Sequence, residues 1–89
     1  MSAYQVNKLC NRLHHDRTFR EAVQADPAKA IAGCPLSDVE RKALLEGDIR
    51  RLYELGTHPY LLGHISRWSV FGVTPAVYAE RIKDAREPA

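Results

Sequence analysis

Residues 55–78 read LGTHPYLLGHISRWSVFGVTPAVY and contain most of the aromatic side chains of the chain, including its only Trp. Two helix starts lie in this stretch, because Pro59 and Pro75 each follow a residue suited to cap a helix, and Pro is favoured at the first helical position. Gly56 and Gly72 precede these starts, and Gly often ends a helix because it tolerates left-handed backbone. The apolar faces of the two predicted helices contain Leu61, Leu62, Ile65 and Trp68, and Val77, Tyr78, Ile82 and Ala85.

The preceding part of the chain shows the same helix signals. Val6, Leu9, Cys10 and Leu13 recur with the period of a helix and predict a first helix over about residues 3–14. No segment alternates between apolar and polar residues over a useful length, so strands are not expected. We therefore predict an all-α fold, with residues 1–89 forming a single compact domain of about six or seven short helices. Further starts are predicted at Asp16, Asp26-Pro27, the capping box from Ser37 to Glu40, and Asp48, with stops at Gly33, Gly47 and Gly56.

Composition narrows the class of protein. The chain has 89 residues, is 45% hydrophobic and 27% charged, and has a net charge of +2. A domain of this size buries only about 60% of the surface that its unfolded chain exposes, so it gains stability from a partner or a second copy. No apolar run approaches the length of a membrane-spanning helix, and the N-terminus does not resemble a signal sequence. We expect a cytoplasmic protein in which Cys10 and Cys34 are free thiols.

The sequence offers few groups that could converge on a reaction. His14 and His15 are adjacent, so on a helix their side chains point about 100° apart and do not clamp one metal ion. His58 and His64 do not form a ligand pair of recognisable spacing, and we expect His58 to serve as a turn residue before Pro59. The sequence therefore predicts no catalytic residue and no metal ligand in this chain.

Candidate binding residues lie on the helix that begins at residue 59. Tyr60 and Arg67 are one helical turn from His64, on either side of it. Gly63 admits two interpretations, since a Gly lets either another helix of this domain or a partner's backbone come close. Aromatic and Arg side chains are enriched at protein interfaces, so we expect Trp68 to anchor the core and Phe71 to lie on the surface.

The order of short motifs along the chain resembles the small all-helical α subunit of protocatechuate 4,5-dioxygenase-type extradiol ring-cleavage enzymes. The resemblance extends from about residue 4 to residue 82 and is strongest over 55–78. The motifs that carry it are YQVNKL at 4–9, ADP at 25–27, LLEGD at 44–48, LG at 55–56, HPYLL at 58–62, and FGVTP at 71–75 followed by Tyr78.

This resemblance implies an accessory role for the chain. In the family, a separate catalytic β subunit holds a non-haem Fe(II) through two His and one carboxylate, and the α subunit covers that site as a helical lid. The resemblance thus implies a catalytic β-type partner, an aromatic substrate of the catechol class, and no cofactor in this chain. The implied substrate-lid residues are His58, Tyr60, Gly63 and His64. The candidate partner-interface residues are Arg67, Trp68 and Phe71.

Two other hypotheses for the function of the chain remain. The chain could be an interaction module without enzymatic role, for example a homodimer that buries the surface from Tyr60 to Phe71. Residues 37–56 also have the spacing of a helix-turn-helix. The second helix of that pair has acidic residues near both ends and few polar side chains that could reach base edges, so we expect no nucleic-acid partner.

Overall fold

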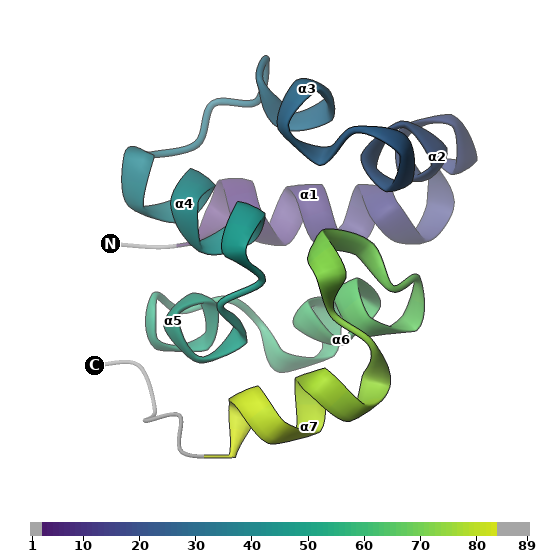
Figure 1. Ribbon diagram of the computed structural model, residues 1–89. Helices are drawn as coiled ribbons and strands as arrows, with labels where there is room; N and C mark the ends of the chain where they lie inside the picture. The colour runs from purple at the N-terminus through teal and green to yellow at the C-terminus, as the bar shows by residue number, and fades with distance from the viewer. Residues whose placement is uncertain (1–2, 84–89) are drawn as a thin grey trace.

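The computed structural model describes residues 3–83, which fold into seven α-helices and one 3-10 turn and contain no strand (Figure 1). This confirms the all-α fold. The α-helices are α1 (Tyr4–His15), α2 (Arg17–Ala25), α3 (Pro27–Ile31), α4 (Asp38–Glu46), α5 (Ile49–Glu54), α6 (Pro59–Arg67) and α7 (Pro75–Ile82). The 3-10 turn, η1, spans Val70–Gly72. Ala85, which we assigned to the last helix, lies outside the described residues.

Local capping explains why the helices begin where the sequence predicts. Ser37 and Glu40 form the expected capping box, with the Ser37 Oγ accepting from the Glu40 N–H at 3.1 Å and the Glu40 carboxylate accepting from the Ser37 N–H at 2.9 Å. Each bond satisfies a backbone donor that a helix start would otherwise leave unpaired. The carboxylates and hydroxyls of other cap residues act in the same way, and these residues are Asp16, Asp26, Asp48 and Thr74.

Gly47 ends α4 and also makes room for the rest of the chain. Its φ of 64° is left-handed, where residues with a side chain are strained. A Cβ at this position would lie 2.7 Å from both the carbonyl oxygen of Phe71 and the Val73 side chain. The turn between α4 and α5 therefore packs directly on the segment that follows α6.

The core is built around the apolar face of α1, which crosses behind the other helices in Figure 1. Helices α1 and α6 form the most extensive contact between elements, and α7 packs on α5 and α6. The fully buried side chains come from nearly every element, as expected for short amphipathic helices wrapped around one core. They include Val6, Leu13, Val23, Ile31, Leu44, Ile49, Leu52, Leu62, Ile65 and Val73.

Phe71 belongs to this core, so the expectation that it lies on the surface is wrong. Its side chain is only 7% exposed, and Val70 beside it is also buried. The reason is the path of the backbone after α6, where Ser69 and Phe71 both take left-handed conformations with φ of 51° and 55°. This tight reversal turns Val70 and Phe71 inward, and η1 contacts α2, α4 and α6. Trp68, expected in the core, is half-buried at the C-cap of α6.

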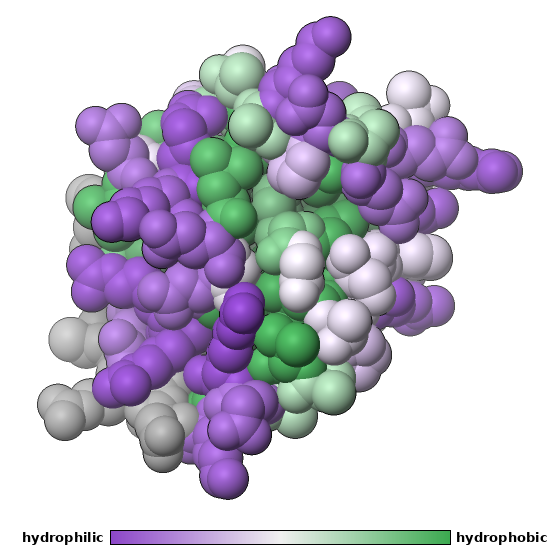
Figure 2. All heavy atoms as spheres, viewed as in Figure 1, coloured by the Kyte–Doolittle hydropathy of each residue, from purple (hydrophilic) through white to green (hydrophobic). Residues whose placement is uncertain are grey.

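Some apolar residues of this small domain remain on its surface. In Figure 2, hydrophilic side chains occupy the flanks, and a band of neutral and apolar residues crosses the middle of the face in view. Small domains retain such surface because their area is large relative to their volume. None of the helices within residues 3–83 is long and apolar enough to cross a membrane.

Candidate functional site

Three aromatic rings form a continuous row across α6 and the end of α1. The Tyr60 ring meets the His64 ring edge to face, with centroids 5.2 Å apart and an interplanar angle of 74°. The other side of His64 stacks on His14, with centroids 4.6 Å apart and an angle of 10°. We call Tyr60, His64 and His14 the ring row. Its first two members lie one turn apart on α6, and the packing of α1 on α6 supplies the third.

The members of the ring row differ sharply in exposure. Tyr60 is 68% exposed, whereas His64 is only 4% exposed. His14 lies on the surface. His64, one of the implied lid residues, is therefore buried, because the rings on either side cover it and α6 turns it toward α1. Tyr60 and His14 are thus the members of the row that are open to contact from outside, and His64 is enclosed between them.

The burial of His64 affects its charge. Desolvation lowers the pKa of His64 below its ordinary value of 6.5, and the nearby charges of His14 and Arg67 lower it further. Since the ring is neutral at pH 7, it has one N–H donor and one nitrogen acceptor. A neutral ring stacks on its neighbours without the repulsion that two imidazolium ions would cause.

His58 acts as the N-cap of α6. The Nδ1 of the His58 ring accepts a hydrogen bond from the backbone N–H of Tyr60 at 3.2 Å. The backbone N–H of His58 donates to the Oδ1 of Asn7 at 2.8 Å. The first contact confirms His58 as the residue that starts this helix before Pro59. The second ties the start of α6 to α1, so His58 and Asn7 set the position from which Tyr60 projects.

Gly63 has no close neighbour within the described chain. A Cβ built on it would meet nothing within 4 Å outside its own helix and adjacent residues. The interpretation that Gly63 lets two helices of this domain cross is therefore wrong. Gly63 is partly buried. The interpretation in which a partner approaches this Gly stays a prediction.

Two cations lie close to the ring of Trp68, at the C-cap of α6. The Arg20 guanidinium is 3.8 Å from the Trp68 ring centroid, and that of Arg67 is 5.3 Å from it. Arg20 also donates to the carbonyl oxygens of Leu13 and His14, each at 3.1 Å. It thereby caps the end of α1 and fastens it to α6. Sequence reasoning missed both Arg20 and His14, because nothing in their local pattern reveals which distant ring each will contact.

The polar groups of this region can be described within residues 3–83. No group of three or more His, Cys, Asp or Glu side chains gathers there in a way that could hold a metal ion. Cys10 is buried, which raises its pKa to about 12, so its sulfur stays a thiol and a poor nucleophile at neutral pH. The site instead presents an exposed phenol, a neutral imidazole beneath it, and the exposed cation of Arg67.

Comparison with known proteins identifies a relationship for this chain. The family described as "Aromatic-ring-opening dioxygenase LigAB, LigA subunit" matches residues 6–82. The matched region takes in the ring row, the two cations around Trp68 and the core. Searches among curated proteins and among solved structures gave no significant match.

Proposed function

The chain belongs to the LigA family of aromatic-ring-opening dioxygenase subunits, and we propose that it is the noncatalytic small subunit of an extradiol ring-cleavage dioxygenase. The observation that carries this proposal is the family match over residues 6–82, which includes nearly every described helix. In the proposal, a separate catalytic subunit binds the aromatic substrate and opens its ring, and this chain assembles with that subunit.

Within such an assembly, we infer that the chain acts as a lid over the partner's active site. Tyr60 supports this role because its ring stands open to solvent on a rigid helix whose start is tied to α1. His64 contacts the Tyr60 ring edge to face, and His14 stacks on the other side of His64, so the Tyr60 ring has a supporting ring behind it. A lid of this kind excludes water and helps to orient substrate.

In this proposal the metal belongs to the partner. A non-haem Fe(II) held by two His and one carboxylate leaves open positions for substrate and oxygen. The residues of this chain would approach that site from outside, with Tyr60 nearest to the substrate. His58 and Gly63 would shape the surface around it.

The experiment is to co-express the chain with a catalytic LigAB-type subunit from the same genome and to measure ring cleavage of catechol-class substrates. We expect a stable complex that turns over faster than the catalytic subunit alone. Tyr60→Ala should lower kcat/KM, with little change in complex formation. Tyr4→Ala is the matched control, because Tyr4 is similarly exposed at 61% but lies outside the ring row.

Two results would contradict the proposal. Equal activity of the catalytic subunit with and without this chain, in an assembled complex, would remove the lid role. Failure of every catalytic subunit to co-purify, together with self-association that Tyr60→Ala weakens, would identify the chain as a homodimeric interaction module.

A further inference from the structure

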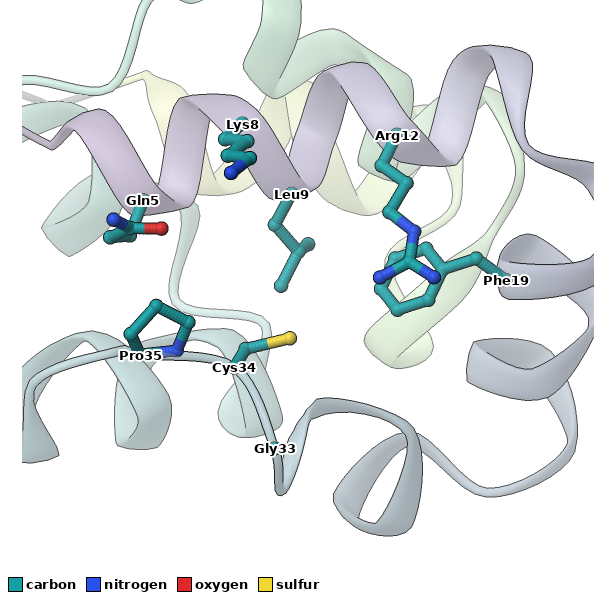
Figure 3. A pocket seen from close by; sticks show the side chains of 8 residues that line it. All are labelled: Gln5, Lys8, Leu9, Arg12, Phe19, Gly33, Cys34 and Pro35. Atoms are coloured by element: carbon teal, nitrogen blue, oxygen red, sulfur yellow. The ribbon is translucent and has the colours of Figure 1, made fainter.

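A cleft opens on the side of α1 that faces away from the ring row (Figure 3). It lies between α1 and the segment Gly33–Pro35, and its volume is about 220 Å³. Lys8 and Arg12 line it from α1, whereas Asn7 and His14 of the same helix contact α6. The cleft is therefore separate from the surface that we assign to the lid.

The floor of the cleft is apolar and its far wall is held in place. Leu9 and Phe19 are buried residues whose edges reach the cleft, and Figure 3 shows Leu9 pointing into it from α1. Arg41 donates to the carbonyl oxygen of Ile31 at 2.7 Å and to that of Cys34 at 3.0 Å. The bond to Cys34 fastens the Gly33–Pro35 segment to α4, and the bond to Ile31 fastens the end of α3 just before it.

The rim of the cleft is positively charged. Lys8 and Arg12 lie one turn apart on α1, and none of the described residues that line the cleft is acidic. Arg12 is engaged, since its guanidinium lies 4.0 Å from the Phe19 centroid and its Nε pairs with Asp16 at 3.1 Å. The side chain of Lys8 makes no ion pair or hydrogen bond with the other described residues. Its ammonium group is therefore free to meet an anion at the mouth of the cleft.

We propose that this cleft binds a small carboxylate that carries a compact apolar body of about one ring. An apolar cavity of about 150 Å³ is large enough to hold benzene, so the cleft suits a ligand of this size. The apolar body would lie on Leu9 and Phe19, and the carboxylate would meet the Lys8 ammonium with Arg12 close by. The aliphatic stem of Lys8 can lie along the apolar surface while its charge stays at the rim.

The test is a titration of the isotope-labelled full-length chain with sodium benzoate, followed by NMR. We expect saturable shifts at the backbone amides of Lys8, Arg12 and Cys34, and a dissociation constant of about 1 mM, as suits so small a ligand. Benzamide has the same shape without the charge and should bind about fivefold more weakly.

Substitutions of exposed Lys residues distinguish binding in the cleft from non-specific attraction of anions to a positively charged surface. Lys8→Gln should weaken benzoate binding about fivefold, and Lys8→Glu should abolish it. Lys42→Gln, an exposed Lys on α4 that does not line this cleft, should leave the binding unchanged.

Three outcomes would overturn the inference. They are shifts that do not saturate, equal affinity for benzamide, and shifts centred on Tyr60 instead of Lys8. Since the titration uses this chain without a partner, its failure would leave the lid proposal standing, and failure of the lid proposal would leave the cleft untouched.

Discussion

The imidazole rings of His14 and His64 lie face to face, with their centroids 4.6 Å apart and their planes within 10° of parallel. One ring comes from the last turn of α1 and the other from the last turn of α6. The pair therefore joins the two helices that make the most extensive contact in the fold. His64 also contacts the ring of Tyr60. The surroundings of this candidate lid residue therefore depend on the protonation state of His64.

Acidification should weaken this contact. The pKa of His64 is lowered from 6.5 in the folded chain, mainly by desolvation. Below about pH 6.5 the His64 side chain takes up a proton in the unfolded chain more readily than in the folded chain. The contribution of His64 to the free energy of unfolding is therefore fully present above about pH 6.5 and is lost as the pH decreases. Urea unfolding at pH 7.5 and pH 5.5 should show this loss.

A matched pair of variants tests whether His64 causes that pH dependence of stability. His64→Gln should reduce the difference in unfolding free energy between the two pH values, whereas His15→Gln should preserve it, since His15 is exposed and makes no ring contact within the described residues. An unchanged difference in His64→Gln would show that another group causes the effect. Asp16 does not interfere, because its pKa is lowered from 3.8 and its contribution is lost only at more acidic pH.

Phe71→Ala should destabilise the isolated chain by about 3 kcal/mol, because it removes a large buried side chain from a small core. Phe71→Asp should unfold the chain, since it also buries a charge without a partner. Thermal unfolding followed by circular dichroism measures both effects. A native-like melting temperature for Phe71→Asp would mean that this side chain reaches solvent.

Ser69→Gly should stabilise the chain by about 0.5–1 kcal/mol. Ser69 has a φ of 51°, which is left-handed, and Gly adopts that backbone without the steric cost that other residues carry. Ser69→Ala is the control, because it removes the same hydroxyl but keeps the strain and should give no gain. If both variants melted at the same temperature, the strain at this turn would not limit stability.

Gly63→Ala should affect the stability of the isolated chain and its affinity for the catalytic subunit in opposite directions. The position is helical and an added Cβ meets no neighbour, so the isolated chain should gain up to about 1 kcal/mol of stability. If a partner's backbone approaches Gly63, the same methyl group should weaken the complex, measured by titration calorimetry with the catalytic subunit. Unchanged affinity would exclude Gly63 from the interface.

The sequence predicted the helices well because their boundaries depend on local contacts. Asp16, Ser37, Asp48 and Thr74 each cap the backbone N–H three residues ahead, and such a bond can be read directly from residue spacing. Two of the three members of the ring row were predictable for the same reason. Tyr60 and His64 share a face of α6 whatever the rest of the fold does.

Contacts between residues far apart in the sequence were decided only by tertiary structure. His14 meets His64 because α1 packs against α6, and Arg20 meets Trp68 where α2 packs against η1, just after α6. Helical periodicity says nothing about which helices become neighbours. Phe71 was misplaced because its left-handed backbone reverses the side that its ring faces. The sequence by itself thus determined the helices, through bonds between near neighbours. The packing of those helices determined which side chains are buried and which, like Tyr60, remain open to a partner.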